Sequence, residues 1–237
     1  MLAEPHVAAG QVSQQLAGHC VEIVEDQGDW LLVRGEDGYE GWMHRGYVVE
    51  QRDGSPAERR MSLGCIARGD DGIRWALPLR AFVPAHAVVE SGDVLGVSEV
   101  AGRFPREAAA ITRSAVELFV GTSYQWGGVT PWGADCSGLV QSTFGLHGVR
   151  LPRDAWQQAR AGEDAGRDMF ALEIADLLFF SDRADAHVTH VAISLGARRI
   201  VHLALGRGGY AIESLGDPSD GYVAKLRERF LFARRVL

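Results

Sequence analysis

A cysteine in a segment of small residues is the feature of this sequence that most clearly points to chemistry. Cys136 lies within the run 134–140, and the apolar residues that follow it indicate a helix beginning at the cysteine. The start of a helix carries partial positive charge, which stabilises a thiolate. The run therefore predicts a nucleophilic cysteine, although a lone thiol between small residues is more often a packed side chain.

Two histidines further along the chain strengthen this interpretation. His190 and His202 lie on two strand-like segments separated by a turn at Gly196. Side chains alternate along a strand, so we expect His190, Ala192 and Ser194 to share one face while the residues between them face the core. A hairpin centred on Gly196 makes the two imidazoles cross-strand neighbours. His190 is then a base for the thiol, and His202 orients it.

These residues belong to an ordered series of motifs through which the chain resembles the NlpC family of bacterial cysteine peptidases. Members of that family are papain-like enzymes that cut peptidoglycan peptides. The resemblance runs from about Phe104 to the C-terminus. It implies an α+β catalytic domain with helices packed on an antiparallel sheet. It also implies a Cys136, His190 and His202 triad, with Tyr124 helping the Cys136 amide to hold the oxyanion. The matching residues are Tyr124-x-Trp126-Gly127-Gly128, Asp135 to Val140, Leu151-Pro152-Arg153 with Gln158 and Gly162, Asp176 to Phe180, Thr189-His190-Val191 and His202.

The chain departs from the family pattern at two positions. Members usually carry glycine where this chain has Ala175, and alanine where it has Leu203. Neither residue is expected to touch the reacting groups.

The resemblance also implies a substrate, the bond between γ-linked D-Glu and a diamino acid in a murein tripeptide or tetrapeptide. Relatives with SH3-like barrels commonly require a free N-terminal L-Ala. We expect Asp135 and Glu40 to hold that ammonium group, and Ser137, which flanks the nucleophile, to be a third substrate-binding residue. A helix N-cap at Asp135 is compatible with this role, whereas a solvated turn residue is the alternative at Glu40. For Arg153, a structural ion pair near Asp154 is favoured over a contact with a substrate carboxylate.

A zinc site is the competing interpretation of the histidines, with His187, His190, His202 and Asp185 as ligands. A spacing of three along a strand turns His187 and His190 to opposite faces, and no His-Glu-x-x-His motif is present. We therefore expect no metal and no cofactor, and a solvated loop position for His187.

Composition limits the remaining functions. The chain has 237 residues, 46% hydrophobic and 23% charged, with a formal net charge of −7, which argues against a nucleic-acid partner. The odd count of three cysteines makes a disulfide framework improbable. The first residues lack the pattern of a secretory signal, and no apolar run is long enough to span a bilayer. We expect a cytoplasmic enzyme that recycles wall peptides, without a membrane partner; oligomeric state is not indicated.

The first hundred residues have a different pattern. Strand-like segments at 20–24, 30–33 and 39–43, with glycine turns between them, predict an SH3-like β-barrel over 6–52. A polar linker at 51–57 precedes a second, diverged barrel over 58–102, and the catalytic domain occupies 104–237. That domain is expected to begin with a helix over 105–119 and to include a helix around 154–158 and strands near 177, 190, 200 and 210.

Two alternatives to the recycling peptidase remain. One is an exported hydrolase that cuts intact stem peptides, and the other is a catalytically silent wall-binding module.

Overall fold

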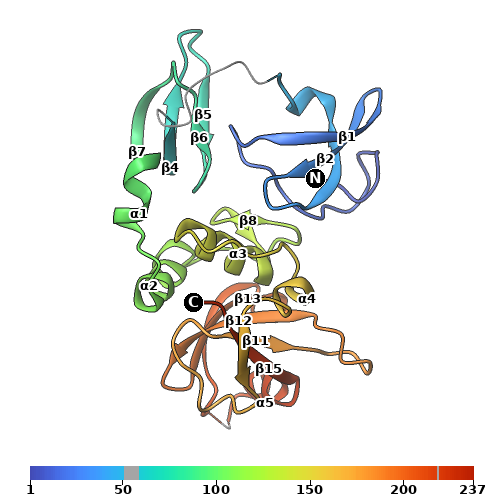
Figure 1. The fold of residues 1–237 in the computed structure, drawn as a ribbon, viewed down its shortest axis with the longest axis vertical. Helices are drawn as coiled ribbons and strands as arrows, with labels where there is room; N and C mark the ends of the chain where they lie inside the picture. Colours follow the sequence, from blue (N-terminus) through green and yellow to red (C-terminus); the bar gives the residue numbers. More distant parts are fainter. Residues whose placement is uncertain (51–58, 218) are drawn as a thin grey trace. The chain divides into compact units, whose positions relative to one another are not determined.

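The computed structural model describes residues 1–50, 59–217 and 219–237 (Figure 1). The chain divides into two compact units, 1–103 and 104–237. The linker predicted at 51–57, and the barrel limits predicted at 52 and 58, lie outside the described residues.

The first unit begins with a three-stranded antiparallel sheet in the order β1 (Val21–Gln27), β2 (Trp30–Gly35) and β3 (Glu40–His44). Gly28 and Gly38 occupy the left-handed region in the two turns. β2 alternates, with Leu31 and Val33 fully buried, as expected for a strand that faces the core on one side. All three strands lie where the sequence predicts them.

A second antiparallel sheet completes this unit. β4 (Arg60–Arg68) pairs with β5 (Arg74–Leu77), β6 (Phe82–Val83) and β7 (Val88–Gly96). The sequence predicts strand-like residues from 88 through 97, and β7 covers nearly all of that segment, with bulges in its pairing to β4. The helical turns η3 (Val97–Glu99) and α1 (Val100–Arg103) end the unit.

The second unit is α+β, as predicted. Its helices are α2 (Ala108–Leu118), α3 (Cys136–Leu146), α4 (Ala155–Gln158) and α5 (Gly221–Glu228), and a small β8 (Val129–Thr130) and β9 (Gly133–Ala134) hairpin precedes α3. Its sheet has six antiparallel strands in the order β10 (Glu163–Gly166), β15 (Phe230–Arg235), β11 (Leu177–Phe180), β12 (His190–Gly196), β13 (Arg199–Ala204) and β14 (Gly209–Ser214). The turn η4 (Leu205–Arg207) joins β13 to β14.

The sheet is covered on the face that carries His190. Ala192 and Ile200 pack there in a cluster with Leu178, Phe180 and Leu226 of α5. α3 packs against β12 and β13, and Figure 1 shows α2 and α3 on one side of the sheet. The prediction that the His190 face is free of core packing is therefore wrong, because the missed helix α5 covers it.

The β12–β13 hairpin is not centred on Gly196 as predicted. Gly196 pairs with Arg199, and the two-residue loop between them is Ala197 and Arg198, both at positive φ. Ile193 then pairs with Val201 after a bulge, so the register is shifted by two residues from the predicted one. Glycine and asparagine are the residues that favour such loop positions, so the sequence points to Gly196 rather than to Ala197 and Arg198.

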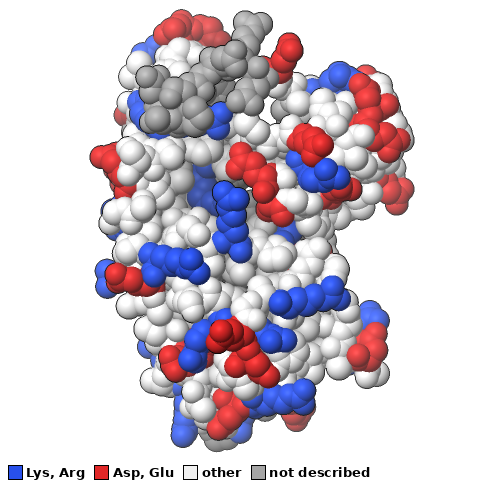
Figure 2. Space-filling view, in the orientation of Figure 1, with Lys and Arg blue, Asp and Glu red and all other residues white. Residues whose placement is uncertain are grey.

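No helix in residues 1–50, 59–217 and 219–237 is long and apolar enough to cross a membrane. On the face drawn in Figure 2, basic and acidic side chains are interspersed rather than gathered by sign.

Candidate active site

Cys136 is the first residue of α3 and is 6% exposed. The Asp135 side chain caps the helix by accepting a hydrogen bond from the Gly138 amide at 2.7 Å. The backbone amides of Val191 and Ser137 interact with the sulfur. Because Val191 directly follows His190 on β12, the sulfur lies beside the strand that carries the proposed base.

Burial disfavours charge on both reacting groups. Desolvation, with a smaller contribution from Asp135, raises the pKa of the Cys136 thiol to about 12. The hydrogen bonds from the two backbone amides lower this pKa, but by less than desolvation raises it. Burial, together with the neighbouring His202 and Arg229, holds the pKa of His190 well below its ordinary value. The sequence predicts a lowered thiol pKa from the helix terminus, and here burial outweighs that effect.

The resting pair is therefore a neutral thiol and a neutral imidazole. Moving the proton from Cys136 to His190 creates both charges together, and their mutual attraction offsets part of the cost of burying each one.

The two histidines meet, although their strands are not in the predicted register. The distance between His190 Nε2 and His202 Nδ1 is 2.8 Å, and their ring centroids are 5.0 Å apart. His202 is fully buried and His190 partly so. In the observed register the two residues are diagonal rather than direct cross-strand neighbours, and diagonal positions remain within reach of long side chains.

Tyr124 lies close to the nucleophile. It forms a bridge with Ala134, two residues before Cys136, and its amide donates to the Gly208 carbonyl at 3.0 Å. Burial, and to a lesser degree the nearby Cys136, raise the pKa of the Tyr124 phenol above its ordinary value. The hydroxyl is thus a neutral hydrogen-bond donor beside the sulfur, as an oxyanion donor must be.

Asp135 is hydrogen-bonded to several groups within the protein. Its Oδ2 accepts from the Gly127 amide at 2.8 Å and from Arg153 at 2.7 Å. Its Oδ1 accepts from Gly138, from the Ser137 hydroxyl and from Arg153. This geometry confirms that Asp135 is the N-cap of α3, and its contact with a substrate ammonium stays a prediction.

Ser137 and Arg153 belong to the same buried network. The Ser137 hydroxyl accepts from Arg153 at 2.9 Å, and Arg153 is 1% exposed. Arg153 therefore forms a structural ion pair, but its partner is Asp135 and not the region of Asp154. The sequence does not reveal this partner because 18 residues separate the pair.

Glu40, the other predicted ammonium ligand, lies in the first unit. It accepts from Arg34 at 2.9 and 2.7 Å, and Arg34 also reaches Glu22 at 2.8 Å. Glu40 is 44% exposed, so it is a solvated residue with a paired charge.

One residue beside the proposed triad cannot be identified from the sequence. Glu213 on β14 lies 3.6 Å from His202 Nε2, and both side chains are buried. A strand carboxylate eleven residues beyond a histidine forms no recognisable motif, so only the sheet pairing reveals it.

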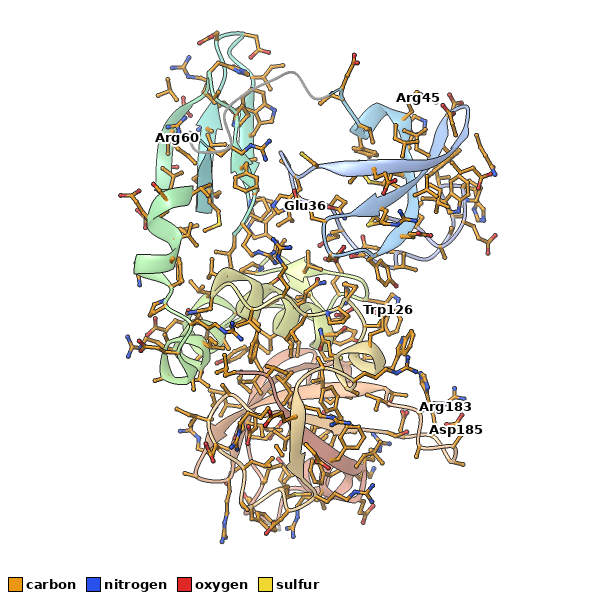
Figure 3. All side chains as sticks on the ribbon, viewed as in Figure 1. Glu36, Arg45, Arg60, Trp126, Arg183 and Asp185 are labelled. Atoms are coloured by element: carbon orange, nitrogen blue, oxygen red, sulfur yellow. The ribbon has the colours of Figure 1, made fainter. Side chains whose placement is uncertain are left out.

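No group of three or more histidine, cysteine, aspartate or glutamate residues in the described ranges could hold a metal ion. Asp185, weighed as a zinc ligand, instead binds Arg183 on an exposed loop (Figure 3), and His187 is exposed nearby. Trp126, which is 68% exposed, projects from its own loop in the same view.

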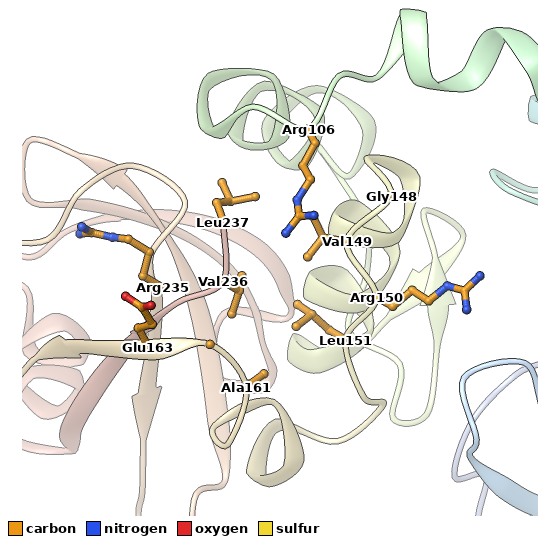
Figure 4. A pocket seen from close by; sticks show the side chains of 11 residues that line it. Arg106, Gly148, Val149, Arg150, Leu151, Ala161, Glu163, Arg235, Val236 and Leu237 are labelled. Atoms are coloured by element: carbon orange, nitrogen blue, oxygen red, sulfur yellow. The ribbon is translucent and has the colours of Figure 1, made fainter.

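A cavity of about 530 Å³ lies elsewhere in this unit, beyond the far end of α3 (Figure 4). Arg106 and Leu237 point toward it, whereas Arg150 points away. None of its lining residues belongs to the Cys136 site, so it is separate from the chemistry.

Comparisons with known proteins give the family of this chain. Residues 121–224 match the model of the NlpC/P60 family, and residues 1–46 match that of the bacterial dipeptidyl-peptidase Sh3 domain. A Bacillus cereus protein named gamma-D-glutamyl-L-lysine dipeptidyl-peptidase is 26% identical, over 95% of this chain and 75% of its own length. A probable endopeptidase from Haemophilus influenzae is 34% identical, over 48% of this chain and 70% of its own.

A solved structure gives the same fold. The crystal structure of an NlpC/P60 family protein from Bacillus cereus superposes with a TM-score of 0.78 at 24% identity, covering 95% of this chain and 82% of that one.

Proposed function

This chain belongs to the NlpC/P60 family of cysteine peptidases, and on that premise we propose that it hydrolyses the γ-D-glutamyl–diamino acid bond of murein peptides with a free N-terminal L-Ala. The observation that carries the proposal is the contact between His190 and His202 beside the Cys136 sulfur. A thiol, a base and an orienting group at one place are what amide cleavage through an acyl-enzyme requires.

In the proposed mechanism the Cys136 thiol passes its proton to His190 as the sulfur attacks the amide carbonyl. The tetrahedral oxyanion accepts hydrogen bonds from the Cys136 amide and the Tyr124 hydroxyl. His190 then returns the proton to the leaving amine of the diamino acid. Water, deprotonated by His190, releases the acyl group and restores the thiol.

The substrate assignment draws its support from the relatives. The Bacillus cereus protein that covers most of this chain is named for a γ-D-glutamyl-L-lysine bond and for dipeptidyl-peptidase activity. Release of a dipeptide means that L-Ala-γ-D-Glu leaves with its amino group free. The Sh3 domain match at residues 1–46 also bears a dipeptidyl-peptidase name. Because Asp135 and Glu40 are paired internally, the amine selectivity is proposed without assigning it to either carboxylate.

The test compares L-Ala-γ-D-Glu-L-Lys and its meso-diaminopimelate counterpart with the same peptides acetylated at L-Ala. We expect cleavage of the free peptides and at least a roughly 100-fold lower kcat/KM for the acetylated ones, since an uncompensated binding group costs several kcal/mol. Equal turnover of both forms rejects the requirement for a free amine. Release of peptides from intact sacculi favours the exported hydrolase, and a protein inert toward every substrate and toward iodoacetamide at Cys136 favours the silent module.

We also propose that the enzyme works in the cytoplasm on recycled wall fragments. A preference for free L-Ala excludes stems still attached to glycan, which fits a substrate already released from the wall. Cell fractionation with antibody detection tests this, and recovery of the protein with the wall or the medium contradicts it.

A further inference from the structure

Glu213 shares a sheet face with the orienting histidine. It pairs with Ile200 across β13 and β14, and Ile200 lies two residues before His202 on the same side of the strand. Glu213 Oε1 is 3.6 Å from His202 Nε2, with the histidine side chain 0% and the glutamate side chain 7% exposed. The carboxylate therefore faces the side of the imidazole opposite to His190.

His202 Nε2 has no closer partner. Within the residues the structure describes, it is a buried nitrogen without a hydrogen bond. A buried polar atom without a partner costs free energy, and Glu213 Oε1 is the acceptor placed to remove that cost after a shift of a few tenths of an ångström.

Arg207 holds the carboxylate in place. Its Nε donates to Glu213 Oε1 at 2.7 Å and its Nη2 to Oε2 at 3.0 Å, a two-pronged contact. Arg207 also binds Asp220, and its guanidinium lies over the Tyr222 ring at 4.3 Å. Despite burial, the contacts with His202 and Arg207 hold the pKa of Glu213 below its ordinary value. Glu213 is thus ionised and only accepts hydrogen bonds.

An acceptor at this position determines which ring nitrogen of each histidine carries a proton. Facing Glu213, neutral His202 carries its proton on Nε2, which leaves Nδ1 as an acceptor. His190 Nε2, at 2.8 Å from that Nδ1, must then be the donor. The remaining nitrogen of His190, Nδ1, is left without a proton and free to take one from a thiol.

We infer that Glu213 is a positioning residue that fixes this proton arrangement, so that His190 is held in the tautomer that accepts the Cys136 proton. The inference rests on the proposed function. When His190 becomes an imidazolium, the negative charge of Glu213, acting through His202, also stabilises it.

Other charged and titratable groups face the two histidines from neighbouring elements. Cys136 lies at the start of α3, Arg207 on η4 and Tyr222 on α5, and Arg229 follows α5. The two arginines are positive and oppose an imidazolium, and Tyr222 is neutral, since burial raises its pKa. Among these groups only Glu213 supplies a buried negative charge on the far side of His202.

The main experiment compares Glu213→Gln with Asp220→Asn. Both replace a carboxylate bound to Arg207 with a neutral amide, and asparagine still caps α5, but only Glu213 faces His202. We expect Glu213→Gln to lower kcat/KM about 10- to 100-fold, the size of effect seen for groups that orient a reactive ligand. The acidic limb of its pH profile, where His190 becomes protonated, should move about one unit lower, because an opposite charge is lost near the imidazolium. Asp220→Asn should keep the wild-type profile.

Two further readouts do not depend on the substrate. The rate of Cys136 alkylation by iodoacetamide against pH, followed by peptide mapping, should show the same shift in Glu213→Gln. Nitrogen NMR of the wild-type protein labelled at histidine should show His190 and His202 protonated on Nε2. A His202 protonated on Nδ1 overturns the inference even if the variant fails to fold, and so does a variant with unchanged pH profiles.

These readouts separate the inference from the proposed function. A wild-type protein that cleaves no murein peptide, yet shows the expected tautomers and alkylation shift, rejects the substrate assignment and retains Glu213 as a positioning residue. If the wild-type protein cleaves the murein peptides but Glu213→Gln has an unchanged pH profile, the substrate assignment is retained and the role of Glu213 is rejected.

Discussion

At the scale of single residues, burial decides what each group beside the nucleophile does. Asp135 and Ser137 are adjacent to Cys136 in sequence, but their polar atoms are bound to Arg153 and to backbone amides. The sequence correctly predicts the helix that begins at Cys136, because that helix follows from a local run. It does not predict the ion pair with Arg153, which exists only after the chain has folded.

Replacing the nucleophile should separate chemistry from folding. Cys136→Ala is expected to lower kcat by roughly 10,000-fold or more, as loss of the nucleophile does in other enzymes that form an acyl-enzyme. The unfolding temperature should stay close to wild type, because the side chain changes by one atom. Cys20→Ala, at a cysteine of the first unit, is the control and should retain full activity in the peptide assay.

The buried ion pair leads to a stability prediction. Arg153→Met leaves Asp135 charged and buried, and should reduce the free energy of unfolding by about 3–5 kcal/mol. Arg183→Met breaks a pair that is more than half exposed and should have no measurable effect. Denaturant unfolding of both variants measures the difference. Equal effects would mean that burial does not govern the strength of the pair.

Buried histidines predict how stability depends on pH. Burial lowers the folded-state pKa of His147 and His190 below the unfolded value of 6.5. Between the two values the unfolded chain binds protons that the folded chain does not, so the free energy of unfolding must fall as the pH drops below about 6.5. Calorimetry from about pH 7 to about pH 5 should show a steady fall in unfolding temperature, above the range where carboxylates protonate. A constant temperature contradicts the assignment.

At the scale of elements, the sequence predicts most strands but not how they are joined. Alternation and glycine turns locate β1, β2 and β3. In the sheet β15 lies between β10 and β11, although both of those strands come much earlier in the chain. No local sequence pattern predicts this strand order. The register of the β12–β13 hairpin depends on Ala197 and Arg198 adopting a conformation that their residue types disfavour.

Ala175 shows the same kind of strain and explains a departure from the family pattern. It is a buried alanine at φ 67°, in the left-handed region that favours glycine, which is the residue expected here from the family pattern. Ala175→Gly relieves about 1–2 kcal/mol of steric strain, which offsets the lost methyl group and the added chain entropy. We expect its stability to equal or exceed wild type. The control Ala233→Gly, at a buried strand position, should lose about 1 kcal/mol.

At the scale of the whole molecule, the chain forms two compact units that meet at residues 103 and 104. Each has its own sheets and its own buried cluster. The second unit contains all the groups of the proposed mechanism, so its fold should not require the first.

A chain of residues 104–237 should therefore fold alone. We expect a cooperative thermal transition and alkylation of Cys136 at a rate similar to that of the full chain. Peptide cleavage by this unit with less discrimination against acetylated L-Ala would assign the amine selectivity to the first unit. A fragment without a cooperative transition would show that the units are not independent.

The covered position of Cys136 has a consequence for oxidative damage. Hydrogen peroxide reacts with thiolates and only slowly with thiols, and it must reach the sulfur to do so. A sulfur that is 6% exposed and whose pKa is raised by burial is a thiolate only in the fraction of molecules that have passed the proton to His190. Peroxide should therefore oxidise Cys136 slowly, with the same dependence on pH as its alkylation by iodoacetamide.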